Sequence, residues 1–370
     1  MTHLLLTGGL GFIGSHIVEQ AIGRGWTVTV IDSLRSDVHA TTDIPNWFTA
    51  LDGNLDLIVA DAGDASPSLL KSVDIVCHQA AKVGLGVDFT DAPDYVESNV
   101  AVTARLLAAM TNNAVRNLVL ASSMVVYGEG LYRSAAGVVQ PQARTVNDLR
   151  SGRFEPTGPD GEQLEPILIS ETDATDPRNV YAVSKLAQEH LSQSWARATG
   201  GRVVALRYHN VFGSRMPTGT PYAGVASLFR TSLANNQAPQ VFEDGNQRRD
   251  FVDVRDVASA NLAAMDWVLQ QHPGIFRAFN VGSGTVRTIG QFAWALAEAM
   301  GGPKPVVTGE FRLGDVRHIT ASSDRIASEL GWRARQDWAD AIREFSTAPA
   351  RLPVQAPDRS RAGKRRNLGR

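Results

Sequence analysis

A glycine-rich turn near the start of the chain limits its possible folds more than any other feature of the sequence. Residues 7–14 read TGGLGFIG, and they join an apolar run, Leu4–Thr7, to a helix-like stretch, Ile13–Arg24. This order of strand, glycine turn and helix is typical of a βαβ unit that binds a dinucleotide, because free amides at the start of the helix can face a pyrophosphate. The turn therefore predicts a dinucleotide site behind the first strand.

Each glycine of this turn has its own expected role. Gly8 would allow the tight turn, Gly11 would let the pyrophosphate approach the backbone, and Gly14 would let helix and strand pack closely. Phe12 and Ile13 belong to the same loop, so we assign all five residues to the cofactor site.

Acidic residues follow the second and third apolar runs. Asp32 is placed so that its carboxylate can accept hydrogen bonds from the adenosine ribose hydroxyls and repel a 2′-phosphate. This favours NAD over NADP, although Arg35 lies close by and keeps NADP open as the alternative. Asp61 is assigned to the adenine edge, with simple loop capping as its alternative role.

Strand-length apolar runs alternate with helix-like stretches along the first half of the chain. Apolar residues fill both faces of each run, as expected for a parallel sheet that helices cover on both sides. We therefore predict an α/β fold with a Rossmann-type doubly wound parallel sheet. The predicted strands are Leu4–Thr7, Thr27–Ile31, Leu57–Ala60, Ile75–His78, Leu118–Ser122, Val203–Tyr208 and Ala278–Val281, and the predicted helices include Ile13–Arg24, Tyr95–Asn112 and Tyr181–Thr199.

Two segments depart from this alternation. Residues 129–176 are rich in Gly, Pro, Arg and Asp and show little periodicity, which predicts a lid or insertion without clear elements. Residues 347–370 are basic and lack an apolar face, which predicts a disordered tail. A solvated terminus is favoured over a role of this tail in binding nucleic acid.

The overall composition argues against several partners. The net charge of −2 gives no electrostatic reason to expect nucleic acid or a membrane surface, and no apolar run is long enough to span a bilayer. Cys77 is the only cysteine, which excludes an internal disulfide and a cysteine zinc cluster, and the histidines show no paired ligand spacing. We expect no metal, and a reducing cytoplasm as the setting.

A tyrosine and a lysine are spaced as a catalytic pair. Tyr181 and Lys185 are four residues apart, so on a helix they project from one face. An ammonium beside a phenol lowers the pKa of the tyrosine and makes it usable as a base. Lys185 could also hold the nicotinamide ribose. The spacing alone is weak evidence, but together with the glycine turn it predicts a redox site.

Two serines follow the fifth predicted strand and emerge at the carboxyl end of the sheet, where ligands bind in open α/β folds. Ser122 and Ser123 could donate hydrogen bonds to a reacting sugar oxygen or carbonyl. In isolation, serines that merely end a strand would be an equally good interpretation.

These motifs together resemble the extended short-chain dehydrogenase/reductase family, and its nucleotide-sugar epimerases and dehydratases in particular. The resemblance covers about residues 3–345 and includes the segment LRYHNVFG at residues 206–213. It implies a Rossmann domain followed by a smaller α/β carboxyl-terminal substrate lobe. It places Ser123 at the catalytic serine position, Ser122 on the nicotinamide side, and Ala80 and Ala81 in a cofactor-side loop.

The same resemblance implies a nucleotide-sugar site. Asn210 and Val211 fall where such enzymes contact substrate, and Arg249 falls in a segment whose arginine binds the diphosphate. In the segment RLGD, Arg312 would contact phosphate and Asp315 the nucleoside ribose. Guanidinium groups bind phosphate in a bidentate manner, although surface Arg–Asp pairs remain the alternative.

The residues after the catalytic serine discriminate between reactions. Family dehydratases carry an Asp-Glu pair there, whereas this chain has Met124 and Val125, which cannot exchange protons. A 4-epimerase needs no further acid or base, so we favour a 4-epimerase acting on a dTDP- or UDP-hexose with NAD. A 4,6-dehydratase, a 4-ketoreductase and a non-catalytic NAD-binding regulatory protein stay as alternatives.

The insertion narrows the resemblance to the dTDP-L-rhamnose 4-epimerase-like and UDP-glucose 4-epimerase-like members. The expected organisation is a Rossmann domain at 1–212 with the insertion at 129–176, and a substrate lobe at 213–346. The chain is expected to recross to the Rossmann sheet near 250–285. A homodimer is expected from the resemblance alone.

Overall fold

A seven-stranded parallel sheet forms the centre of the protein. The computed structural model describes residues 1–39, 41–84, 89–218 and 224–349. The strand order is β13-β9-β5-β4-β1-β2-β3, with every neighbouring pair parallel, so the predicted Rossmann-type sheet is confirmed. The strands are β1 (His3–Thr7), β2 (Thr27–Asp32), β3 (Leu55–Val59), β4 (Ile75–His78), β5 (Asn117–Ser123), β9 (Arg202–Tyr208) and β13 (Phe276–Val281).

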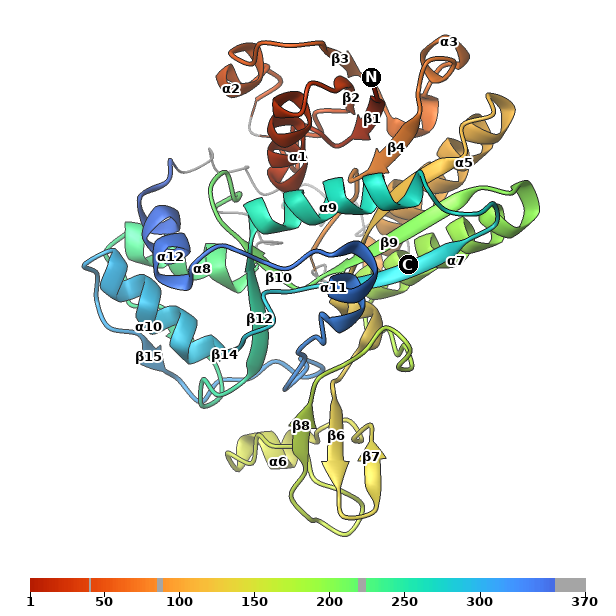
Figure 1. Cartoon of the computed structure of the whole chain (residues 1–370). Helices are drawn as coiled ribbons and strands as arrows, with labels where there is room; N and C mark the ends of the chain where they lie inside the picture. Colours follow the sequence, from red (N-terminus) through yellow and green to blue (C-terminus); the bar gives the residue numbers. More distant parts are fainter. Residues whose placement is uncertain (40, 85–88, 219–223, 350–370) are drawn as a thin grey trace, which may run out of the picture.

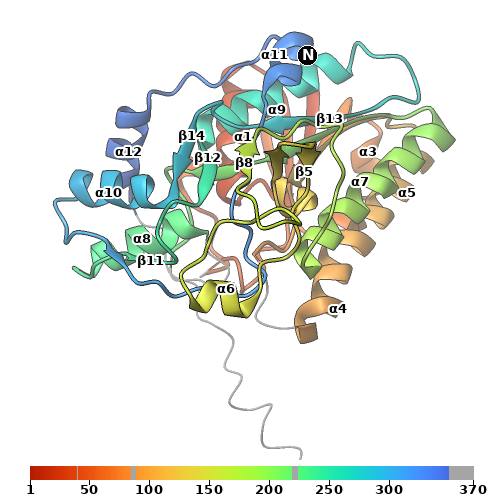
Figure 2. The same ribbon diagram turned by 90° about the horizontal axis from the view of Figure 1, so that it is seen from below.

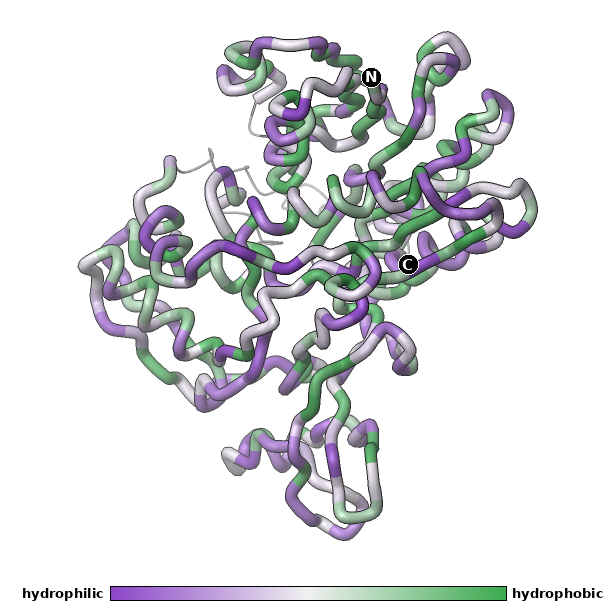
Figure 3. The backbone as a smooth tube through the Cα atoms, in the orientation of Figure 1, coloured by the Kyte–Doolittle hydropathy of each residue, from purple (hydrophilic) through white to green (hydrophobic). Residues whose placement is uncertain are grey.

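Helices cover both faces of this sheet, which explains why its strands are apolar throughout. Leu4 and Leu6 pack into one hydrophobic cluster, whereas Leu5 packs into the cluster on the opposite face. Figure 2 shows β5 between α9 on one side and α7 on the other, and the strands form hydrophobic stretches of the tube in Figure 3. One face carries α1 (Phe12–Gly23), α2 (Asn46–Thr49), α9 (Val254–Val268) and α11 (Asp324–Leu330); the other carries α3 (Pro67–Leu70), α5 (Val102–Asn112) and α7 (Val180–Thr199).

The helix predicted over Tyr95–Asn112 is divided into three parts. It consists of α4 (Ala92–Tyr95), a π-helical segment η3 (Val96–Ala101) and α5. Within η3, the Asn99 side chain accepts a hydrogen bond from the Lys82 amide at 2.7 Å and donates one to the Lys82 carbonyl at 2.9 Å. The wider π turn therefore accompanies a side-chain contact to the β4 loop, which periodicity could not predict.

The carboxyl-terminal lobe packs around a cluster of aromatic rings. Phe212, Phe251 and Phe292 are buried, and the rings of Phe251 and Phe292 are stacked with their centroids 4.4 Å apart. The lobe contains a three-stranded sheet in the order β10-β12-β14 and a pair of parallel strands, β11 and β15. Its elements are β10 (Asn210–Phe212), α8 (Val225–Ala234), β11 (Gln240–Val241), β12 (Arg248–Asp253), β14 (Val286–Thr288), α10 (Ile289–Ala299), β15 (Val306–Val307) and α12 (Trp338–Thr347).

The insertion at 129–176 has regular structure, so the expectation that it lacks clear elements is wrong. It folds into an antiparallel sheet in the order β7-β6-β8 and a short helix, α6, which project from the main body in Figure 1. These strands are only three or four residues long, too short for periodicity to reveal them. The elements are β6 (Leu131–Ser134), β7 (Gly137–Val139), α6 (Val146–Arg150) and β8 (Glu165–Ile167).

The predicted basic tail lies almost wholly outside the described residues, since α12 ends at Thr347 and residues 350–370 are not described. Among the helices that are described, none is both long and apolar enough to cross a membrane.

Candidate active site

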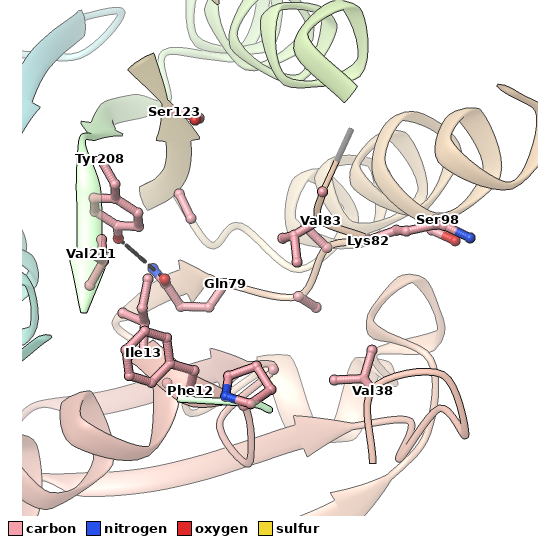
Figure 4. Close-up of a pocket in the computed structure, with 18 of the residues that line it drawn as sticks. Phe12, Ile13, Val38, Gln79, Lys82, Val83, Ser98, Ser123, Tyr208 and Val211 are labelled. Carbon is pink, nitrogen blue, oxygen red and sulfur yellow. Dashed lines mark hydrogen bonds between the residues drawn. The ribbon is translucent and has the colours of Figure 1, made fainter. Parts of the chain in front are cut away.

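All residues assigned to the cofactor line one cavity. This cavity has a volume of about 420 Å³ and lies at the carboxyl ends of the sheet strands. In Figure 4, Phe12 and Ile13 form one of its walls, and Ser123 lies on the opposite side. The assigned residues that line it are Gly8, Gly11, Phe12, Ile13, Gly14, Asp32, Asp61, Ala80, Ala81, Ser122, Tyr181 and Lys185.

The glycine turn forms a cradle that larger residues would fill. Gly8 has a φ of +68°, and a Cβ at this position would lie 2.7 Å from the Ala80 amide nitrogen. A Cβ at Gly14 would lie 2.2 Å from the Gly8 carbonyl oxygen, so the close packing expected there is between helix and loop. Gly11 precedes α1 and brings no capping side chain, which leaves the first amides of the helix facing the cavity. These residues fit a dinucleotide pyrophosphate.

Asp32 is held in place by the loop it faces. Its carboxylate accepts hydrogen bonds from the amides of Leu10 and Leu34, each at 3.0 Å, and lies 3.3 Å from the His39 ring. Burial alone would raise the pKa of Asp32, but the hydrogen bonds from His39 and from the two amides hold it below its usual value. An ionised acceptor therefore faces the position expected for the adenosine ribose.

The structure shows the capping role of Asp61, and its contact with the adenine edge stays a prediction. It lines the cavity, and it also caps the short helix η1 (Ala62–Asp64) by accepting a hydrogen bond from the Gly63 amide at 2.8 Å. Its carboxylate also lies 3.3 Å from the Arg105 guanidinium, with which it forms an ion pair.

The geometry removes the argument for NADP that rested on Arg35. The guanidinium of Arg35 donates to both Asp37 oxygens at 2.9 Å and also to Asp94 and Ser98. A 2′-phosphate would have to compete with these carboxylates, so the charge around the cavity favours NAD. Lys82, which also lines the cavity, is buried and pairs with Asp94.

Tyr181 and Lys185 lie on the first turns of α7, next to Ser123 at the end of β5. The predicted lowering of the Tyr181 pKa by Lys185 is not found. Burial raises the pKa of Tyr181 to about 12, and the hydrogen bond with Ser123 is what opposes this rise. The Lys185 ammonium donates to the Ala121 carbonyl at 2.9 Å, and burial lowers its pKa to about 7 against the attraction of Glu189.

Ser122 lines the cavity, so its contact on the nicotinamide side stays a prediction, but its hydroxyl is already engaged elsewhere. It donates a hydrogen bond to Glu189 at 2.5 Å, toward α7, because this buried carboxylate needs donors. Glu189 in turn pairs with Arg207 at 2.7 Å. Ser122 therefore links the end of β5 to a buried ion pair, whereas Ser123 forms a hydrogen bond with Tyr181.

A second cavity of about 480 Å³ adjoins the first, and Asn210 lines both. Arg249, Arg312 and Asp315 line this second cavity, so the structure brings together the three residues that were predicted to contact the diphosphate and the nucleoside ribose. Val211 lines the first cavity only. The Arg249 guanidinium also donates to the carbonyls of residues 316 and 317 at 2.8 and 2.9 Å, so part of its hydrogen-bonding capacity shapes the wall of the cavity.

His209 was not among the predicted site residues. It lines the first cavity, and within the described part of the chain its two ring nitrogens and the Asn210 side-chain oxygen are buried without hydrogen-bond partners. Burial lowers the pKa of His209 to about 3, so the ring is neutral. Since an unpaired buried polar group costs about 1–3 kcal/mol, we expect these atoms to face a ligand. The sequence does carry a signal for this residue, because His209 is a polar residue directly after the apolar strand β9.

Comparisons with known proteins agree with this geometry. The model of the NAD dependent epimerase/dehydratase family matches residues 4–282. The chain is 35% identical to dTDP-L-rhamnose 4-epimerase of Burkholderia thailandensis over 353 residues, which cover 93% of this chain and 94% of the relative.

Two solved structures share the fold over nearly their whole length. The UDP-N-acetylglucosamine 4-epimerase of Methanobrevibacter ruminantium, in complex with UDP-N-acetylmuramic acid, superposes with a TM-score of 0.74 at 27% identity and covers 93% of this chain and 97% of its own. The UDP-glucose 4-epimerase of Thermus thermophilus, in complex with NAD, has a TM-score of 0.71 at 28% identity and covers 93% and 98%.

Proposed function

The chain belongs to the NAD dependent epimerase/dehydratase family, and on that premise we propose that it is a nucleotide-sugar 4-epimerase. Its substrate would be a dTDP- or UDP-hexose, and the reaction would pass through a 4-keto sugar. The observation that carries the proposal is the placement of Tyr181 and Ser123 beside the glycine cradle, next to a second cavity with Arg249 and Arg312.

The residues of the first cavity supply the proton chemistry. Tyr181, in its phenolate form, would accept the proton from the sugar 4-hydroxyl, while Ser123 fixes the phenolic oxygen through their hydrogen bond. Gly8, Gly11 and Asp32 would hold the pyrophosphate and the adenosine ribose of NAD. When bound, NAD would accept a hydride from C4 and return it to the opposite face of the keto sugar, and its positive ring would favour the phenolate.

The wall of the second cavity argues against elimination of the 6-hydroxyl. A 4,6-dehydratase must remove a proton at C5 and protonate the leaving oxygen, and both steps need titratable side chains. Met124 and Val125 line this cavity directly after Ser123, and neither can exchange a proton. A 4-epimerase needs proton exchange only between Tyr181 and the sugar 4-hydroxyl. The residues present are therefore sufficient for epimerisation.

Incubation of the purified protein with dTDP- and UDP-hexoses, without added cofactor, tests this proposal. The relative from B. thailandensis makes dTDP-L-rhamnose the first sugar to assay. We expect C4 epimers by NMR, and NAD by mass spectrometry of the ligands released on denaturation. Accumulation of a 4-keto-6-deoxy sugar from a hexose that carries a 6-hydroxyl would instead show a dehydratase, and a dependence on added reduced cofactor would show a ketoreductase.

We also propose that the protein forms a homodimer in the cytoplasm. Phe89, Val96 and Val183 are exposed by 82%, 51% and 52%, on elements that contact one another around α4 and α7. Replacing Val183 by Glu is expected to convert a dimer to a monomer in light scattering. The matched variant Val286→Glu, on β14 and 41% exposed, should leave the mass unchanged. A monomeric wild-type protein would contradict the proposal.

A further inference from the structure

The insertion reaches the wall of the second cavity through a buried arginine. The Arg144 side chain lies 2.8 Å from one carboxylate oxygen of Glu243 and donates a hydrogen bond to the Asp315 carbonyl at 2.8 Å. Glu243 and Asp315 both line the cavity, whereas Arg144 comes from the segment just before α6. A residue of the insertion therefore contacts the substrate lobe from behind the cavity wall.

A second buried arginine extends this contact. Arg317 is fully buried, lies 2.9 Å from the other carboxylate oxygen of Glu243, and donates to Glu155 of the insertion at 3.0 Å. The carboxylate of Glu129, at the start of the insertion, accepts hydrogen bonds from the amides of Arg317 and His318, each at 3.0 Å. The segment 315–318 is thus held on one side by the insertion and on the other by the arginine of the cavity, Arg249.

The charge of Glu243 matters for a diphosphate ligand. Its carboxylate is buried and lines the cavity that also contains Arg249 and Arg312. An unpaired carboxylate in such a place would repel phosphate and attract these cavity arginines. Arg144 and Arg317 each pair with one of its oxygens, but Arg317 also pairs with Glu155 and Asp244. Arg144 is therefore the cation whose charge most directly offsets Glu243 beside the cavity arginines.

We propose that Arg144 is a positioning residue of the substrate site, which neutralises Glu243 and fixes the segment that carries Arg312 and Asp315. The insertion is then a structural part of the nucleotide-sugar site. This inference rests on the proposed function in one respect only, that the ligand of the second cavity is a nucleoside diphosphate sugar.

Replacement of Arg144 by Met and by Lys separates its charge from its bulk. We expect Arg144→Met to weaken binding of dTDP and UDP in calorimetry by roughly tenfold or more, because a buried carboxylate loses its partner. KM for the sugar substrate should rise in parallel, with kcat and bound NAD close to wild type. Arg144→Lys keeps the cation and should retain more of the affinity. The matched control is Arg153→Met in the same insertion, whose side chain is 64% exposed and pairs with Asp148; it should bind like wild type.

The double variant Arg144→Met with Glu243→Gln keeps the test decisive if the single variant unfolds, because it removes both buried charges. It should recover affinity relative to Arg144→Met, or fold where Arg144→Met does not. Equal affinities of the Met, Lys and wild-type proteins would overturn the inference, as would a fall in kcat at unchanged KM. Binding of dTDP and UDP is read without turnover, so a wild-type protein that binds them but does not epimerise sugars contradicts the proposed function alone. A wild-type protein that binds neither overturns this inference.

Discussion

Replacing Tyr181 by Phe is expected to lower kcat by about 100- to 10,000-fold, since the change removes the proton acceptor. The protein is expected to keep its NAD. The aromatic ring stays in place, next to the Tyr95 ring with centroids 6.1 Å apart, so little repacking is expected. Loss of the hydroxyl also removes the hydrogen bond with Ser123. The measurement is the initial rate of C4 epimerisation, with bound NAD quantified after denaturation.

Tyr95→Phe is the matched control for this variant. It also loses one phenolic hydroxyl beside the same ring, but that hydroxyl donates to the Gly84 carbonyl at 2.7 Å. We expect its kcat to stay close to wild type. A Tyr181→Phe protein that retained most of its turnover would show that another group takes the proton. Absence of turnover in wild type and variant alike, with NAD bound to both, would favour a regulatory NAD-binding protein.

The central sheet could be predicted because its strands carry their signal locally. Val119 packs toward one layer of helices and Leu118 toward the other, so every residue of β5 from Leu118 to Ala121 had to be small or apolar. The glycine turn was equally informative, because Gly8 and Gly14 meet backbone atoms at distances that no side chain tolerates. The prediction of the family and of the NAD cofactor depended largely on this turn, and the comparisons with known proteins confirmed both.

Side-chain partners far apart in the sequence could not be predicted. Nothing near Ser122 indicates that its hydroxyl is directed to Glu189, and nothing near Arg144 indicates Glu243. Such pairs depend on tertiary packing, as does desolvation. The helical spacing correctly placed Tyr181 and Lys185 on one face, but it carried no information on the burial that raises one pKa and lowers the other.

Replacing Arg207 by Met is expected to lower the free energy of unfolding by about 3–5 kcal/mol, because it leaves the buried Glu189 carboxylate without its paired guanidinium. Arg207 and Glu189 are 6% and 3% exposed, and their closest approach is 2.7 Å. The Ser122 hydroxyl would remain as the hydrogen-bond donor to the carboxylate, with the charge of Lys185 nearby. Urea unfolding of the NAD-loaded protein measures the loss.

Two further variants decide whether burial is the cause. In the double variant Arg207→Met with Glu189→Leu, both charges are removed, so most of the lost stability should return. The pair formed by Arg105 and Glu97 is the exposed counterpart, with side chains 43% and 65% exposed. Arg105→Met should lower the free energy of unfolding by less than about 1 kcal/mol, because water screens the charge that remains. If Arg207→Met cost no more than Arg105→Met, the buried pair of Arg207 and Glu189 would not stabilise the fold, and the stabilising role assigned to it would be contradicted.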